Sequence, residues 1–109
     1  MTGFDAYDLA VELAREMRGV VEAIRRHDRS LADQTRRATQ SIGLNVGEAR
    51  GRKGGDRTHA FRIALGSARE ARAAVDQADA WGYVAPERAA RVLELLDREL
   101  AMLWRLSGN

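Results

Sequence analysis

Apolar side chains recur every three or four residues in four successive segments of this 109-residue chain. That spacing places them on one face of an α-helix. The clearest stripe lies near the N-terminus and consists of Leu9, Leu13, Met17, Val20 and Ile24. Nowhere do apolar and polar residues alternate over a length that favours a β-strand. The pattern therefore predicts an all-α fold.

The breaks between the four segments predict the bounds of four helices, over residues 5–27, 31–50, 57–81 and 86–107. Helices of this size are each roughly 30–40 Å long, so they can pack side by side along their whole length. Short connections force neighbouring helices to run antiparallel. We therefore expect one domain over residues 1–109, an antiparallel up-down-up-down four-helix bundle.

Residues suited to helix ends lie at the predicted boundaries. Asp5, Ser30 and Asp56 can each accept a hydrogen bond from the first turn of a helix, and we expect them to be N-caps. Gly82 suits the position that follows a helix C-terminus. Pro86 suits the first helical turn, where a missing N–H costs nothing.

The other three helices also have faces that we expect to point into the core. In the second helix this face is Leu31, Thr35, Ala38, Ile42, Asn45 and Ala49. In the third it is Phe61, Ala64, Leu65, Ala68, Ala71, Val75 and Ala78. In the fourth it is Ala89, Leu93, Leu96, Leu100 and Leu103.

Alanine makes up much of the apolar content. The chain has 19 alanines, whereas Leu, Ile, Val and Phe together number 23. Alanine favours helix and close packing but buries little area. Small domains with a thin core often gain burial by self-association, so we expect a homo-oligomer.

The positive charge of the chain is concentrated in one segment. Residues 30–55 carry five basic and two acidic side chains, a net charge of +3, while residues 1–29 sum to −1 and the rest is neutral. The five basic residues are Arg36, Arg37, Arg50, Arg52 and Lys53.

We regard these five residues as a candidate nucleic-acid-binding surface, because arginine matches phosphate oxygens in geometry and charge. Arg36 and Arg50 share one helix face with Gln40, Gly43 and Gly47, and small residues there would let a partner approach closely. The alternative is a solvated helix face followed by a basic, flexible turn. No aromatic residue lies near this segment in the sequence, which argues against base stacking there.

Polar residues at or near the helix seams form a second candidate group. Asn45 is predicted to lie at a seam, where a buried amide needs hydrogen bonds, and Glu48 follows one turn later. Either they belong to a polar network that sets helix register or oligomeric state, or they contact a ligand. Ser67 and Glu70 on the third helix are assigned to the same structural polar network.

Several kinds of chemistry are not indicated. Without cysteine the chain cannot form disulfides or thiolate metal sites, and no metal or other cofactor is expected. No phosphate-binding loop, di-iron motif or nucleophile elbow has its required spacing, so we expect a non-enzymatic protein. The N-terminal residues do not resemble a signal peptide and no apolar stretch could span a bilayer, so a cytoplasmic location is expected.

A set of short motifs gives the chain a family resemblance. The motifs are Gln34-x-Arg36-Arg37-Ala38-x-x-Ser41-Ile42-x-x-Asn45-Val46-x-Glu48, then Gly51-Arg52, Ile63-Ala64-Leu65-Gly66-Ser67-Ala68-x-Glu70 and Ala80-x-Gly82-Tyr83. With these motifs the chain resembles the four-helix bundle proteins encoded in 23S rRNA intervening sequences. It departs from their usual pattern at Gly43-Leu44 and Gly47-Glu48-Ala49.

The resemblance implies a ring-shaped homopentamer and kinship with the accessory protein of diversity-generating retroelements, which works with a reverse transcriptase and RNA. It also implies a family of largely unknown molecular function. From residues and resemblance together we expect a homo-oligomer that binds structured nucleic acid, either RNA or DNA, with RNA favoured. A reverse transcriptase or another protein is a further candidate partner. The alternative is a protein-interaction scaffold ring that binds no nucleic acid.

Overall fold

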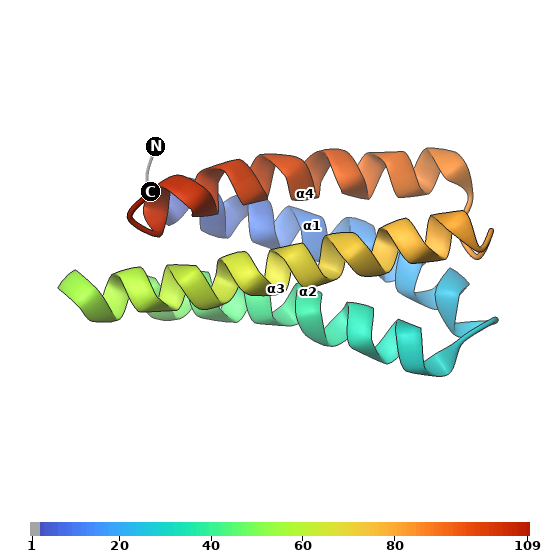
Figure 1. Ribbon diagram of the computed structural model, residues 1–109, viewed down its shortest axis with the longest axis horizontal. Helices are drawn as coiled ribbons and strands as arrows, with labels where there is room; N and C mark the ends of the chain where they lie inside the picture. The colour runs from blue at the N-terminus through green and yellow to red at the C-terminus, as the bar shows by residue number, and fades with distance from the viewer. Residues whose placement is uncertain (1–2) are drawn as a thin grey trace.

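The computed structural model describes residues 3–109 and contains four helices over that range. They are α1 (Gly3–Arg25), α2 (Arg29–Arg50), α3 (Gly54–Ala80) and α4 (Pro86–Leu106). No strand occurs among the described residues. The helices run antiparallel, each beside its neighbours in sequence, and α4 lies beside α1 (Figure 1). The prediction of an all-α four-helix fold is confirmed.

Three of the predicted helix starts are wrong in detail. α2 begins one residue before Ser30, because Asp28 is its N-cap and accepts a hydrogen bond from the Leu31 backbone N–H at 2.9 Å. α3 begins at Gly54, so Asp56 lies in its first turn, and Lys53 is the N-cap residue. The predicted N-cap Asp5 likewise lies inside the first turn of α1.

The predicted end of α3 and start of α4 agree with the structure. Gly82 has φ +74°, a conformation that glycine adopts without strain. Its N–H donates to the Asp79 carbonyl at 3.0 Å, and the next N–H, of Tyr83, donates to the Ala78 carbonyl at 2.8 Å. These two bonds form a Schellman motif, which ends α3. Pro86 occupies the first turn of α4.

The core is built largely from small side chains. Among the described residues, twelve of the 28 buried hydrophobic side chains are alanine. On α3 they alternate with a few large groups, of which Phe61 is the largest. Small side chains let helix axes approach closely, and the molecule is accordingly slender, 42 × 22 × 20 Å. No helix within residues 3–109 is both long and apolar enough to cross a membrane.

The predicted core faces of α1 and α3 are confirmed, and those of α2 and α4 are confirmed in part. The buried residues among those predicted are Thr35, Ala38, Ile42 and Ala49 on α2 and Ala89, Leu96 and Leu103 on α4. On α2, Leu31 and Asn45 are half-buried and Val46 is buried in their place. On α4, Leu93 and Leu100 are half-buried. Val92, Leu95 and Glu99 are fully buried there instead.

Glu99 is therefore a carboxyl group inside an apolar core. Its side chain has no solvent exposure, and neither carboxyl oxygen has a hydrogen-bond partner among the described residues. Burial raises the pKa of Glu99 to about 8, because the core cannot solvate a negative charge. The group is consequently neutral in the folded protein at pH 7.

This burial predicts that Glu99→Gln stabilises the protein increasingly as pH rises. The unfolded chain releases the Glu99 proton near pH 4.5, whereas the folded chain holds it to about pH 8. Between these values the unfolded state binds fewer protons, so the free energy of unfolding of the wild type falls with pH and levels off above pH 8. Urea titrations at pH 5, 7 and 9 should show a gap between variant and wild type that widens to on the order of 4 kcal/mol. A gap that stays constant with pH would contradict the buried, neutral carboxyl.

Candidate nucleic-acid interface

The five predicted basic residues do not form one patch. Arg36 and Arg37 are exposed near the middle of α2, whereas Arg50, Arg52 and Lys53 lie at its C-terminal end and in the following turn. Arg36 and Arg50 are separated by roughly 21 Å along the helix. Only an extended ligand could contact both groups at once.

The group at the end of α2 is partly engaged within the protein. The Arg50 guanidinium lies over the Tyr7 ring, 4.7 Å from its centroid. Arg52 forms an ion pair with Glu48 one turn earlier, and this contact raises the pKa of Arg52. Lys53 is exposed at the start of α3. Glu48 is thus the counter-ion of a predicted binding residue rather than a member of the seam network.

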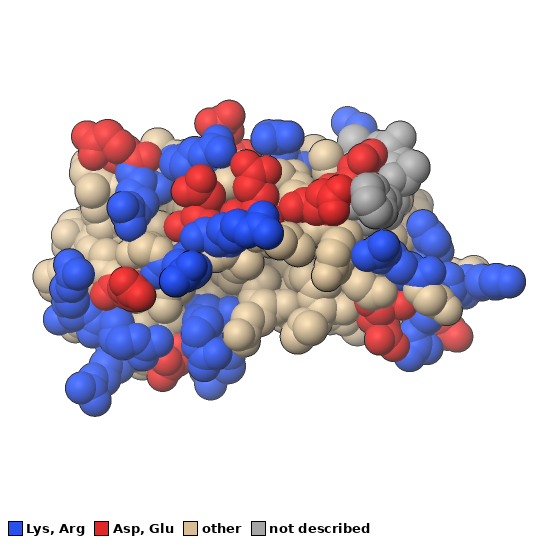
Figure 2. Space-filling model, turned by 180° about the vertical axis from the view of Figure 1, so that it is seen from behind, with Lys and Arg blue, Asp and Glu red and all other residues tan. Residues whose placement is uncertain are grey.

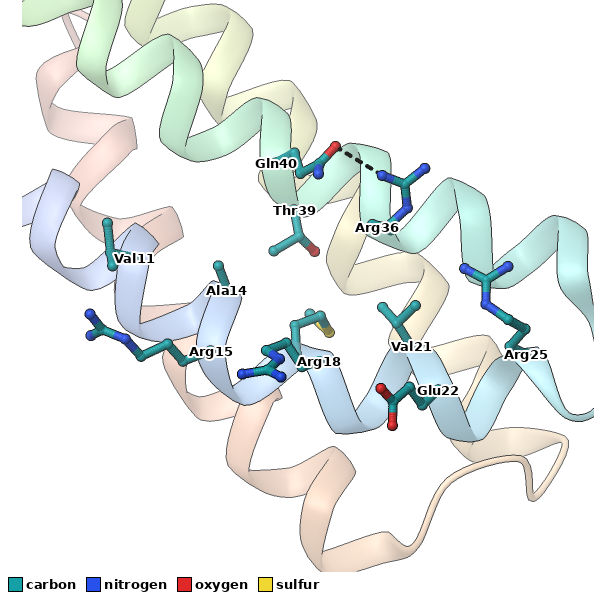
Figure 3. Close-up of a pocket in the computed structure, with 11 residues that line it drawn as sticks. Val11, Ala14, Arg15, Arg18, Val21, Glu22, Arg25, Arg36, Thr39 and Gln40 are labelled. Atoms are coloured by element: carbon teal, nitrogen blue, oxygen red, sulfur yellow. Dashed lines mark hydrogen bonds between the residues drawn. The ribbon is translucent and has the colours of Figure 1, made fainter.

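The other group, around Arg36, borders a groove between α1 and α2. The groove has a volume of about 530 Å³ (Figure 3). Its floor is uncharged and includes Ala14, Val21 and Thr39. Arg36 lies on the α2 side and donates to the Gln40 side-chain oxygen at 3.4 Å. A guanidinium held at the rim of an open groove is available to an anion.

Helix α1 supplies three further arginines to this groove, which the sequence analysis missed. Arg15, Arg18 and Arg25 line it opposite Arg36, together with Glu22 (Figure 3). The net charge summed over residues 1–29 did not reveal these arginines, because α1 carries more acidic than basic side chains overall. Their spacing was the available signal: positions 15, 18, 22 and 25 are separated by three, four and three residues and share one helix face.

Arg25 closes the end of the groove near the α1–α2 turn. It donates to the Asp33 carboxylate at 2.8 Å and so ties the two helices together. The contact lowers the pKa of Asp33 below its usual value. Viewed from behind, basic side chains are spread over both ends and the upper middle of the molecule, where acidic side chains lie among them, and the lower middle of this face is uncharged (Figure 2).

Gly43 and Gly47 line an open hollow between α1 and α2, and both also lie against side chains of α1. A Cβ atom on Gly47 would lie 3.3 Å from the Tyr7 ring, and one on Gly43 would lie 3.8 Å from the Ala10 Cβ. Both glycines therefore face α1 of the same chain. They allow α1 and α2 to pack closely.

The predicted polar network is smaller than expected. The Asn45 side-chain amide donates to the Ser41 carbonyl at 2.8 Å and to the Ser41 hydroxyl at 3.0 Å. That hydroxyl lies 2.7 Å from the Ser67 hydroxyl on α3. Glu70 is exposed on α3 and makes no hydrogen bond or ion pair within residues 3–109. The network therefore links α2 to α3 through Asn45, Ser41 and Ser67 alone.

Beside this network, a shallow hollow lies between α2 and α3. Asn45, Glu48 and Arg52 line it, together with two large apolar side chains, Leu44 and Ile63. Leu44 is 72% exposed and Ile63 is 42% exposed. Exposed apolar groups next to polar ones are typical of surfaces that contact another protein chain.

Guanidinium groups on both sides of the α1–α2 groove can bind phosphate oxygens through charge-assisted hydrogen bonds. Within residues 3–109 no group of three or more His, Asp or Glu side chains is arranged to hold a metal ion. Glu99 has a strongly raised pKa, but it is enclosed in the core and reaches none of these surfaces.

Comparison with known proteins identifies relatives of the chain. The family model for the 23S rRNA-intervening sequence protein matches residues 3–105. The fold is similar to the crystal structure of a protein of unknown function from the S23 ribosomal protein family of Bacteroides thetaiotaomicron, with a TM-score of 0.87 and 19% sequence identity. The alignment covers 95% of this chain and 99% of that one. No curated protein matches the sequence significantly.

The network between α2 and α3 predicts a specific pattern of stability changes. Ser41→Ala removes an acceptor from Asn45 and the partner of Ser67, and should lower the free energy of unfolding by about 1–2 kcal/mol. Ser67→Ala should cost less, because Asn45 keeps both of its contacts. Urea denaturation of both variants and of the double variant measures the coupling between the two hydroxyls. Strictly additive effects would contradict a bond between them.

Proposed function

Because the chain belongs to the 23S rRNA-intervening sequence protein family, we propose that it is a non-enzymatic, homo-oligomeric helical bundle that binds structured nucleic acid, RNA in preference to DNA. The observation that carries this proposal is the clustering of exposed arginines on α1 and α2. Arg36 of α2 faces Arg15 and Arg18 of α1 across the groove, and Arg37 is exposed on α2 outside the groove lining.

Phosphate binding accounts for this distribution of charge. Arginines from two helices border one groove, so a nucleic-acid backbone lying over it meets guanidinium groups from both sides. Arg50 lies at the C-terminal end of α2, and Arg52 and Lys53 lie in the turn that follows. A nucleic-acid backbone that continued along α2 would contact these three residues as well. The groove floor is uncharged, and no described aromatic side chain lines it, so the contact there reads backbone and shape rather than stacked bases.

Self-association is the second part of the proposal. The alanine-rich core buries few large side chains, and Leu44 and Ile63 remain exposed together beside the α2–α3 hollow. Burying them against another copy would recover apolar area that a monomer leaves in water. A ring of copies would repeat the arginines and strengthen their combined field. The five-membered ring follows from the family resemblance.

A protein-interaction scaffold is the second candidate function. The uncharged floor of the α1–α2 groove favours it, because a partner helix could lay an apolar face along Ala14 and Val21. Recovery of a stoichiometric protein partner from nuclease-treated lysate, with no nucleic acid bound to the purified protein, would favour the scaffold.

Replacing the five predicted residues Arg36, Arg37, Arg50, Arg52 and Lys53 with alanine should greatly weaken nucleic-acid binding. Each contact between a basic side chain and a phosphate releases counterions, so the affinity of the wild type should fall steeply as the salt concentration rises. The variant makes fewer such contacts, so its affinity should depend less on salt. Filter binding of a structured RNA between about 50 and 200 mM salt measures both effects.

A matched pair of variants separates position from overall charge. Arg36→Ala/Arg37→Ala alters the proposed surface, whereas Arg69→Ala/Arg98→Ala removes the same charge from exposed positions on α3 and α4. The first pair should weaken binding and the second should not. Equal losses in both pairs, or an affinity that does not depend on salt, would refute the proposed surface.

Leu44→Asp should reduce the mass of the assembled protein. A charged group at this exposed position cannot be buried against another copy without a large desolvation cost. Light scattering should give a multiple of the 12.1 kDa chain for the wild type and a smaller species for the variant. Ala101→Asp on exposed α4 is the control and should assemble normally. Unchanged assembly of Leu44→Asp would exclude this patch from the contact between copies.

A further inference from the structure

Three aromatic rings stack at the end of the bundle where α1 joins α2 and α3 joins α4. The His27 and Tyr83 rings are nearly parallel, 6° apart, with their centroids separated by 4.8 Å. Trp81 continues the stack, with its ring 20° from that of Tyr83 and a centroid separation of 6.4 Å. Aromatic Phe, Trp and Tyr residues make up only 6% of the chain, so this gathering is a local concentration.

Two separate turns bring the rings together. His27 lies in the turn after α1, where its N–H donates to the Ile24 carbonyl at 2.9 Å. Trp81 and Tyr83 lie on either side of Gly82 in the Schellman motif that ends α3. Both turns are held by backbone hydrogen bonds, so the ring stack is positioned before any ligand arrives.

Both outer rings of the stack are open to solvent. Trp81 is 70% exposed and His27 is also exposed, while Tyr83 between them is half-buried and packs against the core. An exposed indole contributes little to the stability of the bundle, because most of its apolar area stays in water. A flat ligand could cover this ring and lengthen the stack by one member. Tyr83 is thus fixed against the core, and the Trp81 ring remains accessible to a ligand.

Positive charge adjoins the stack. Arg26 precedes His27, and Arg29 begins α2 two residues after it. Neither guanidinium has a hydrogen bond or ion pair within residues 3–109, and together with Arg25, Glu22 and Asp33 they line one shallow hollow. Arg25 is occupied by Asp33 at 2.8 Å. Two guanidiniums without a partner in residues 3–109, both within two residues of His27 in the sequence, suit a ligand that carries both a flat ring and a phosphate.

We propose that Trp81, Tyr83 and His27 form a stacking platform for an unpaired base of a single-stranded nucleic acid, with Arg26 and Arg29 contacting the adjoining phosphates. Bases stack on aromatic rings in a largely sequence-tolerant way, and basic side chains follow the backbone. A protein partner would be expected to use exposed aliphatic groups as well. Leu44 and Ile63, the large exposed aliphatic side chains among the described residues, line the hollow between α2 and α3 instead.

The platform goes beyond the proposed function, because its three rings lie outside the lining of the α1–α2 groove, and only Arg25 and Glu22 line both that groove and the hollow that holds Arg26 and Arg29. Arg50, Arg52 and Lys53 lie at the far end of α2 from Arg29. The α1–α2 groove would contact structured nucleic acid through its backbone, whereas the platform would capture an unpaired base from a loop or a strand end. Each surface can therefore be tested while the other is intact.

The test compares Trp81→Ala with Trp104→Ala, since both tryptophans are exposed. Fluorescence anisotropy measures binding of a labelled 12-nucleotide single-stranded RNA, a single-stranded DNA of the same sequence, and the corresponding RNA duplex. Trp81→Ala should weaken binding of the single-stranded RNA about 10-fold, within the range for loss of one stacked base. It should leave the duplex unaffected. Trp104→Ala should leave all three affinities unchanged.

Comparison of the single-stranded RNA with the single-stranded DNA shows which nucleic acid supplies the stacked base. A larger effect of Trp81→Ala on RNA than on DNA assigns the platform to RNA, and equal effects assign it to either nucleic acid. Both results support base stacking. Quenching of the Trp81 emission in a Trp104→Phe background by the single strand would place the base on the ring itself.

Three results would overturn the platform: single-strand affinity that is unchanged in Trp81→Ala, equal losses for single strand and duplex, or a changed assembly mass in this variant. The last would assign Trp81 to contacts between copies. The variant with alanine at residues 36, 37, 50, 52 and 53 distinguishes failure of the proposed function from failure of the platform. If it binds structured RNA normally while Trp81→Ala loses the single strand, the proposed surface of these five residues fails and the platform stands. The reverse pattern retains that surface and rejects the platform.

Discussion

Close packing of helices along alanine-lined seams is the constraint on which the rest of this structure depends. Twelve of the 28 buried hydrophobic side chains in the described residues are alanine. Gly43 and Gly47 of α2 lie against Ala10 and Tyr7 of α1, respectively, and let these two helices approach closely. Helices packed this closely leave little interior volume for large side chains. Leu44 and Ile63 consequently stay on the surface, and this leftover apolar area is the physical basis for proposing self-association.

The same packing determines where the charges can lie. Because α1 and α2 meet along small residues, the longer side chains beside that seam project outward on both helices. Arg15 and Arg18 then face Arg36 across a groove with an uncharged floor. A surface that looks weakly basic when summed along the sequence becomes a two-sided basic groove in three dimensions.

Much of the fold could be predicted from the sequence, since apolar spacing at three and four residues directly reports buried helix faces. The stripes from Leu9 to Ile24 and from Phe61 to Ala78 are buried as predicted. The failures have local causes. Asp28 competes successfully with Ser30 as the N-cap of α2. On α4 a run of leucines permits more than one inward face, and the observed face buries Glu99.

The surfaces were harder to predict than the fold, because they depend on which segments become neighbours. The stack of His27 on Tyr83 joins residues 56 positions apart through two unrelated turns. The contact of Ser41 with Ser67 likewise crosses from α2 to α3. Periodicity within one helix contains no information about such pairs. Glu48 illustrates the opposite error, because its partner, Arg52, is a helix neighbour that simple i, i+4 spacing would have indicated.

The central claim is that this bundle assembles and carries nucleic acid on its arginine-bordered surface. Light scattering of the purified protein, with absorbance recorded at 260 and 280 nm across the same peak, tests it most directly. The account predicts one species several times the 12.1 kDa mass of the chain, with excess absorbance at 260 nm from bound nucleic acid. A 12.1 kDa monomer free of nucleic acid would contradict it.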